Sequence, residues 1–330
     1  MDPGGHAEAT GIEPNNDEEI DSAFGEGDST YTATLRSSLL ESVQENGRGY
    51  HKYRDGVYIL PEDAREQERL DLQHEMFLRS LDRKLYLAPI DEPVHEALDL
   101  GTGTGTWAID FADQHPEANV VGVDLSPIQP SWVPPNCRFV VDDFDKEWAY
   151  KTKFDFIHGR MLLTSSADFP TLFQRAYDSL RPGGWIEMQD LYMPLKCDDG
   201  SMDGTTYQQW NELYIQACSK LGRDPSYTAK YKEWMTTAGF DGVEEEVFKW
   251  PVNTWPKDDK LKEMGSWNLI NMLDGLEGFT VRLWTMALEM STEEIEVILA
   301  GVRKDVQDKR IHSYWPMYVV YGRKPSSGPG

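Results

Sequence analysis

The sequence predicts an α/β fold built on a parallel sheet, and three observations support this prediction. Short apolar strands alternate with helical patterns from residue 95 onward. The first strand, within HEALDLG, ends in a glycine-rich turn that leads directly into a helix. The second strand, within NVVGVDLS, ends in an acidic residue. Strands that alternate with helices are typical of parallel sheets with right-handed crossover connections.

The N-terminal part of the chain is predicted to lie outside this sheet. Residues 1–30 contain nine carboxylates and no lysine or arginine, so we expect a disordered acidic tail. Residues 31–93 are predicted to form a helical cap. Its main element is an amphipathic helix from Glu62 to about Leu87, which follows Pro61 and carries apolar residues at helical spacing.

Residues 94–192 are predicted to form the cofactor-binding core. Its five strands are expected within HEALDLG, NVVGVDLS, CRFVVDDF, KFDFIHGRML and WIEMQDLY. Helices are expected over TWAIDFADQH and from Pro170 to Leu180, and RPGG is predicted to turn the chain into the fifth strand.

Residues 193–325 are predicted to complete the sheet and to add helices. We expect helices over 205–221, 227–238 and 292–309, with Thr292 as the N-cap of the last one. Two further strands are expected, within VEEEVFKWPV and IHSYWPMYVVYGRK.

A helical insertion over about 253–290 is predicted to act as a substrate lid. It contains Trp255, Met264, Trp267 and Met272, which would line an apolar pocket in a lid or pack in the core in the alternative interpretation. Residues 326–330 are predicted to form a second disordered tail.

The charge of the chain limits its partners. It has 32 Lys and Arg residues and 57 Asp and Glu residues, which gives a net charge of −25. Such acidity disfavours direct binding to nucleic acid or to anionic membranes. Its three cysteines have no paired spacing, which predicts neither a disulfide framework nor a structural metal site. With no leader-like start and no long apolar run, we expect a soluble protein of the cytoplasm, the nucleus or both.

The glycine-rich turn points to a nucleoside-containing cofactor. Gly101, Gly103 and Gly105 connect the first strand to its helix, where free backbone N–H groups and the absence of a Cβ allow a ligand to approach closely. Asp124 lies at the end of the second strand, where a carboxylate can accept the hydroxyls of an adenosine ribose. A plain tight connection is the alternative interpretation of the turn.

The spacing of the glycines separates two classes of cofactor. A dinucleotide fingerprint, G-x-G-x-x-G, would place its third glycine at position 106, which is threonine here. The pattern G-x-G-x-G with Asp99 two residues before it resembles the first motif of S-adenosylmethionine-dependent methyltransferases.

Several further motifs narrow the resemblance. The segments GRGYHKYRDGVYILPED, EQERLDLQH and FDFIHGRM, the glycine motif followed by Trp107, and CDDG, AGF, WPVNTWP and KRIHSY occur in this order. Over residues 46–325 the chain therefore resembles the LaeA-like fungal methyltransferases, which include velvet-interacting members. The resemblance implies a class I Rossmann-like sheet of seven strands that are mostly parallel, with the last strand antiparallel.

The resemblance also implies a function. It predicts transfer of a methyl group from S-adenosylmethionine to a small-molecule or protein acceptor, leaving S-adenosylhomocysteine and needing no metal, in secondary metabolism or developmental regulation. A velvet-family protein is a possible partner. The alternative is a regulatory scaffold with a methyltransferase fold and little turnover. A nicotinamide-dependent reductase is disfavoured, because the Tyr192-to-Lys196 spacing is interrupted by Pro194.

Individual residues receive expected roles from these motifs. Asp143 at the end of the third strand is expected to face the adenine, with Asp142 as the alternative. His158 and Glu187, which lie on the fourth and fifth strands, are the candidate catalytic residues, and structural roles are the alternative for both. The expected cofactor-binding residues are Tyr58, Asp99, Gly101, Thr102, Gly103, Gly105, Asp124, Leu125, Asp142, Asp143, Phe144 and His158.

Overall fold

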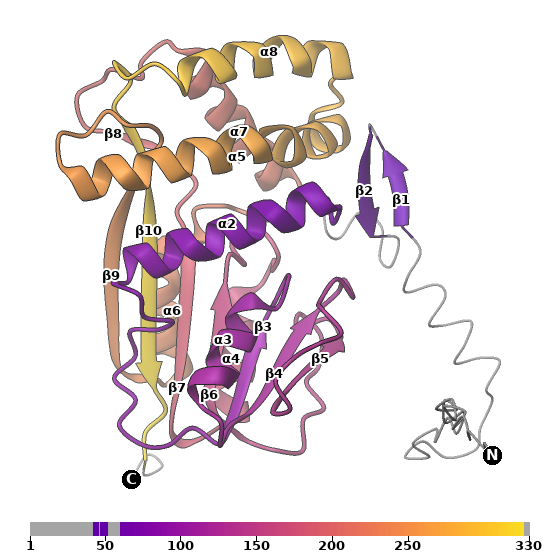
Figure 1. Ribbon diagram of the computed structural model, residues 1–330, viewed down its shortest axis with the longest axis vertical. Coiled ribbons are helices and arrows are strands. Elements are labelled where there is room, and N and C mark those ends of the chain that lie inside the picture. The colour runs from indigo at the N-terminus through magenta and orange to yellow at the C-terminus, as the bar shows by residue number, and fades with distance from the viewer. Residues whose placement is uncertain (1–41, 46, 52–59, 327–330) are drawn as a thin grey trace, which may run out of the picture. The chain divides into compact units, whose positions relative to one another are not determined.

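An eight-stranded sheet forms the centre of the fold in the computed structural model, which describes residues 42–45, 47–51 and 60–326 (Figure 1). Its strands follow the order β5-β4-β3-β6-β7-β10-β8, and β9 also pairs with β10. They are β3 (Glu96–Leu100), β4 (Asn119–Asp124), β5 (Cys137–Val141), β6 (Phe154–Arg160), β7 (Leu180–Leu191), β8 (Lys196–Cys197), β9 (Asp241–Pro251) and β10 (Ser313–Arg323).

The pairing directions confirm the predicted topology. Strands β3 to β7 pair in parallel, whereas β10 is antiparallel to each of its neighbours β7, β8 and β9. The seven predicted strands are all present. The eighth, β8, is a two-residue strand that the sequence pattern did not indicate.

Helices cover the sheet and extend beyond one end of it. They are α2 (Ala64–Ser80), α3 (Thr106–Gln114), α4 (Phe169–Ser179), α5 (Thr206–Lys220), α6 (Tyr231–Ala238), α7 (Asp259–Leu288) and α8 (Thr292–Asp305), with a short 3-10 helix at Tyr227–Lys230. Figure 1 shows α2 crossing near the tips of β3 and β6, with α7 and α8 above it. Helix α7 packs against both α2 and α5, so the helices cover the edge of the sheet at which its parallel strands end.

The first helix is shorter than predicted. Asp63 caps its start by accepting a hydrogen bond from the backbone N–H of Glu66, but the helix ends at Ser80 instead of near Leu87. The reason is a left-handed turn at Asp82 and Arg83, whose φ angles are 50° and 68°. The chain then runs as a loop to β3.

The N-terminal cap also differs from the expected set of helices. Within residues 31–93 the described part contains an antiparallel hairpin, β1 (Ser42–Glu45) and β2 (Arg48–His51), before α2. The predicted acidic tail lies outside the described residues, as do residues 327–330 at the other end.

The predicted insertion forms a single long helix, α7, whose N-cap is Asp258. Met264 and Met272 on this helix are buried in the hydrophobic core beside α2 and α5. The following helix, α8, is capped by Ser291 and not by Thr292, because Ser291 and Glu294 form a capping box.

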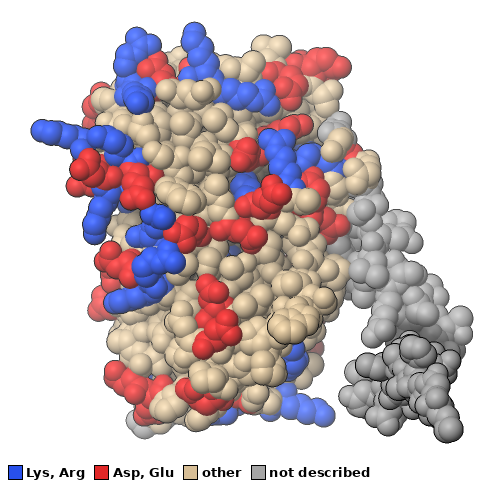
Figure 2. Space-filling view, viewed as in Figure 1, with Lys and Arg blue, Asp and Glu red and all other residues tan. Residues whose placement is uncertain are grey.

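Charged side chains of both signs occur on the face drawn in Figure 2. Lysine and arginine side chains alternate there with acidic ones, including over the upper helices. In the described part of the chain, no helix is both long enough and apolar enough to cross a membrane.

Candidate cofactor and acceptor site

A cavity lies where β3, β4 and β6 end, beneath α2. Residues of the glycine turn form one side of this cavity, and side chains of α2 and α7 form another. Parallel α/β sheets bind their ligands at this edge. The cavity therefore has the position that the sequence predicted for the cofactor.

The glycine turn presents one open position. Gly103 has a φ of +57°, and a Cβ placed there would meet only Leu70, at 3.7 Å. Gly105 has a φ of +81°, but a Cβ there would collide with the ring of Phe139. Gly103 is thus the position where a ligand can approach the backbone, whereas Gly105 is required by packing.

Asp124 is held by the same turn. Its carboxylate accepts hydrogen bonds from the backbone N–H groups of Gly103 at 2.8 Å and Ser126 at 2.9 Å. Burial raises the pKa of Asp124 to about 6, and the two backbone donors oppose this shift. Asp124 and its neighbour Leu125 both line the cavity.

Asp99 and His158 form a buried pair at the base of the turn. Asp99 accepts from the Thr102 hydroxyl at 2.6 Å and lies 2.7 Å from His158 Nδ1. The imidazole stacks on Trp107, with 3.7 Å between ring centroids. Burial lowers the pKa of His158, and Asp99 partly offsets this. The ring is therefore neutral near pH 7 and donates from Nδ1 to Asp99.

The structure distinguishes the two acidic residues after β5. Asp143 and Phe144 line the cavity, whereas Asp142 is exposed and is not part of the lining. The Asp142 carboxylate accepts from the backbone N–H of Asp143. Asp143 is therefore the better placed of the two to face an adenine.

Glu187 lies beneath the cavity and does not line it. Its Oε2 accepts from the backbone N–H groups of Leu87 and Ala88, and its Oε1 accepts from the Gln189 amide. Burial raises the pKa of Glu187 to about 7. These contacts fasten the loop that follows α2 to the sheet.

Arg160 is the last residue of β6 and lines the cavity. Its guanidinium donates to His74 Nδ1 at 3.0 Å and lies over the ring of Phe77. His74 Nε2 is 3.0 Å from Asp110. This links the edge of the sheet to α2 and α3.

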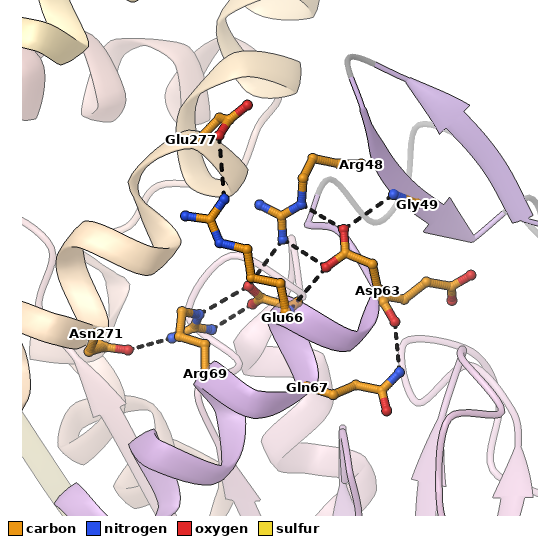
Figure 3. Close-up of polar contacts among 10 residues, drawn as sticks. Arg48, Gly49, Asp63, Glu66, Gln67, Arg69, Asn271 and Glu277 are labelled. Atoms are coloured by element: carbon orange, nitrogen blue, oxygen red, sulfur yellow. Dashed lines mark hydrogen bonds and ion pairs between the residues drawn. The ribbon is translucent and has the colours of Figure 1, made fainter.

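A cluster of buried and half-buried polar side chains lies beside the cavity beneath the helices; we call it the roof network (Arg48, Asp63, Glu66, Arg69 and Asn271). Figure 3 shows these side chains converging from β2, α2 and α7. Arg69 makes two hydrogen bonds to Glu66 and donates to Asn271 at 2.6 Å. Arg48 pairs with Asp63. Arg69 and Asn271 also line the cavity, so the network joins three distant segments around it.

The far end of the cavity is apolar and aromatic. Its side chains are Leu191, Met193, Tyr214, Phe279 and Trp315. The indole N–H of Trp315 is buried and has no hydrogen-bond partner among the described residues. This end is suited to an acceptor with an apolar body.

Several predicted site residues have other positions, and some lining residues were not predicted. Tyr58 lies outside the described residues, and none of Trp255, Met264, Trp267 and Met272 is part of the cavity lining. Sequence reasoning missed Arg69, Asn271, Phe279 and Trp315. Only Asn271, a polar residue on an apolar helix, gave a signal in the sequence.

Metal coordination has no obvious location in the described ranges. No three His, Cys, Asp or Glu side chains there are grouped closely enough to hold an ion.

Comparison with known proteins identifies the family. A family model for a methyltransferase domain matches residues 72–245. The chain belongs to this methyltransferase family. The methyltransferase is 41% identical to methyltransferase pytC of Aspergillus terreus, over 96% of this chain and 98% of that protein.

Two laeA proteins are also similar to this methyltransferase. It is 38% identical to the secondary metabolism regulator laeA of Aspergillus fumigatus, over 89% of this chain and 80% of that protein. It is 34% identical to the protein-methionine methyltransferase laeA of Emericella nidulans, over 86% of this chain and 76% of that protein. The predicted LaeA-like resemblance and the class I fold are thereby confirmed, and the enzyme is an S-adenosylmethionine-dependent methyltransferase of this type.

Proposed function

We propose that this methyltransferase binds S-adenosylmethionine in the cavity at the strand ends and transfers its methyl group to an acceptor at the aromatic end. The observation that carries the proposal is the meeting of Gly103, Asp124 and Asp143 around one cavity. These residues supply an open backbone, a carboxylate for ribose hydroxyls and an acid for the adenine amine. S-adenosylmethionine supplies an already activated methyl group on a sulfonium.

The protein's contribution is positioning and the exclusion of water. Methyl transfer requires the acceptor atom to be aligned close to the methyl carbon, and a base helps only for some acceptors. Both side chains are fully buried: Glu187 is engaged in hydrogen bonds, and His158 lines the cavity with its Nδ1 bonded to Asp99 and its Nε2 without a partner among the described residues. We therefore assign His158 the role of orienting Asp99, and Glu187 the role of fixing the loop after α2, in place of a proton transfer.

The acceptor is a small molecule with an apolar body or an apolar protein side chain. The aromatic lining at Tyr214, Phe279 and Trp315 supports this class of acceptor. One relative, the Emericella nidulans protein, is named for methionine in proteins as its acceptor. The setting proposed for this chain is fungal secondary metabolism or development, which follows from its similarity to the laeA regulators.

Partners and location extend the same proposal. On the basis of the LaeA-like resemblance, we propose that the partner is a velvet-family protein. On the same basis, we propose that the protein is located in the nucleus, the cytoplasm or both. The charge of −25 supports action through such a partner and not through direct contact with nucleic acid. Co-purification of the full chain with a velvet-family protein from fungal extract would support this part, and its absence would contradict it.

Calorimetry and labelling test the main proposal. S-adenosylhomocysteine should bind the full chain with one site, and a chelator should leave its affinity unchanged. With methyl-labelled S-adenosylmethionine and fungal extract, label in the organic-soluble fraction identifies a small-molecule acceptor, and label in protein identifies a side chain. Absence of binding would refute the enzyme proposal, and binding with no label in either fraction would favour the scaffold alternative.

A further inference from the structure

Arg160 differs from Arg48 and Arg69, the two arginines of the roof network. Arg48 and Arg69 are each paired with a carboxylate at 2.6 Å. Arg160 makes no ion pair within 4.0 Å with any carboxylate in the described part of the chain, and its one hydrogen bond goes to His74. Arg160 also lines the cavity.

The partner of Arg160 holds it without neutralising it. Nδ1 of His74 accepts from the guanidinium, so the proton of the neutral ring lies on Nε2, which donates to Asp110. Burial lowers the pKa of His74, which keeps this ring neutral. Burial also lowers the pKa of Arg160 to about 10, so the guanidinium stays charged at neutral pH.

A desolvated guanidinium with no carboxylate in direct contact is costly, and Asp99 and Asp110 compensate the charge of Arg160 only from beyond ion-pair distance. Burial of a charge is compensated when it is paired and hydrogen-bonded. The planar guanidinium matches a carboxylate with two parallel hydrogen bonds. The cavity therefore offers a binding position for a carboxylate at the end of β6.

The order of the strands indicates which carboxylate this is. Asp143 follows β5, Asp124 ends β4, the glycine turn follows β3 and Arg160 ends β6, and these four strands are consecutive neighbours in the sheet. A ligand with adenine at Asp143 and ribose at Asp124 crosses the glycine turn and places its amino-acid end over β6. Leu100, just before the turn, pairs with Gly159, so Arg160 lies next to the turn.

We propose that Arg160 binds the α-carboxylate of the cofactor's amino-acid portion, and that His74 and Asp110 hold the guanidinium in position. This inference rests on the proposed function. It assigns Arg160 a contact with the cofactor, whereas His74 acts through Arg160 as a positioning residue.

A pair of ligands tests the proposal without any variant. S-adenosylhomocysteine and its decarboxylated analogue share the adenosine, the thioether and the amine. Calorimetry of the wild-type chain should show about ten- to a hundredfold tighter binding of S-adenosylhomocysteine, the range expected for a hydrogen-bonded charge pair. Equal affinities would overturn the proposal, whereas failure of both ligands to bind would refute the proposed function itself.

Variants then assign the effect to the residue. Arg160→Gln should lose most of the preference by weakening only S-adenosylhomocysteine, Arg160→Lys should keep part of it, and His74→Leu should reduce it less than Arg160→Gln does. Arg79→Gln is the matched control, because Arg79 also lies over an aromatic ring, that of Trp267, but outside the cavity. Equal weakening of both ligands by Arg160→Gln would show a structural role and contradict the proposal.

Discussion

His158 lies directly opposite Asp99 in the parallel pairing of β6 with β3, and its Nδ1 is 2.7 Å from the Asp99 carboxylate. The register of the sheet therefore places an imidazole beside the acid that precedes the glycine turn. Trp107, on the helix that follows the same turn, stacks on the imidazole and fixes its plane. Strand, turn and helix are thus joined at one buried pair, which gives the cavity a rigid base.

Asp124 should make cofactor affinity depend on pH. Because burial raises its pKa to about 6, acidification through that value protonates the carboxyl and removes an acceptor for the ribose hydroxyls. Calorimetry with S-adenosylhomocysteine should show weaker binding below this pH. Asp124→Ala should weaken binding by about 1.5–3 kcal/mol at neutral pH. A loss below about 0.5 kcal/mol would remove the ribose role.

The control for this experiment is Asp142→Ala. Asp142 is exposed and outside the cavity, so its removal should leave the affinity unchanged. A loss for Asp142→Ala comparable to that of Asp143→Ala would instead favour Asp142 as the residue that faces the adenine.

Two glycines of the turn should respond differently to substitution. Gly103→Arg should abolish binding of S-adenosylhomocysteine while the chain stays folded, because the added side chain has room at its root but occupies the ligand's approach; the φ of +57° should cost only a small drop in melting temperature. Gly105→Ala should lower the melting temperature, because its Cβ collides with Phe139. Calorimetry and thermal melting separate the two effects, and unchanged affinity in Gly103→Arg would place the cofactor elsewhere.

Glu187 should lower stability as the pH rises. Its folded-state pKa of about 7 lies above the value of 4.5 for an unperturbed glutamate. The contribution of protonated Glu187 to the free energy of unfolding is therefore fully present below about pH 4.5. It is lost as the pH rises through about 7. Urea unfolding measures the free energy of unfolding at each pH. Between about pH 5.5 and about pH 8.5 this free energy should fall less for Glu187→Gln than for the wild type, because glutamine does not ionise.

The wild type must be compared with Glu187→Gln because other buried titratable groups also make stability depend on pH. Asp190, whose pKa burial raises to about 7, acts in the same direction as Glu187. Burial lowers the pKa of His74 and His158, so these groups act in the opposite direction. Glu212→Gln, at an exposed position on α5, is the control. An identical pH slope in the wild type and Glu187→Gln would contradict the raised pKa.

The roof network should depend strongly on Glu66. Glu66→Ala leaves the guanidinium groups of Arg48 and Arg69 buried with reduced compensation, which should cost about 3–5 kcal/mol of unfolding free energy. Combining Glu66→Met with Arg69→Met should recover much of this loss. The exposed pair Arg79–Glu263 provides the contrast, because Glu263→Ala should cost less than about 1 kcal/mol. Equal losses would show that burial does not govern this network.

The sequence predicted those features that depend on local pattern. The G-x-G-x-G turn directly follows β3 in the sequence, and Asp124 ends β4, the next strand along the chain. The positions of both therefore follow from the order of the strands in the sheet. Helix α2 was predicted too long because apolar spacing continues through Leu81 and Leu85, although the chain turns left-handed between them. A lid helix and a core helix have the same apolar spacing, so the sequence could not show that Met272 is buried in the core and does not line the cavity.

The candidate site could be predicted only on its cofactor side. Asp143 was favoured over Asp142 by motif alignment; in the structure Asp143 is half-buried and lines the cavity, whereas Asp142 is exposed, and which of them faces the adenine stays a prediction. The partners of Glu187 and Arg160 come from segments about 100 and 86 positions away. Such contacts arise from packing, which carries no periodic signal in a single sequence.

The bond from Arg69 to Asn271 has a consequence for the order in which the protein is made. Its two ends are 202 positions apart, whereas β3 to β7 and the glycine turn all emerge from the ribosome in between. Because chains begin to fold during synthesis, the nucleotide side of the cavity can assemble while its cover is still untranslated. A chain that stops before residue 271 would contain every residue of the glycine turn and still leave Arg69 without this partner.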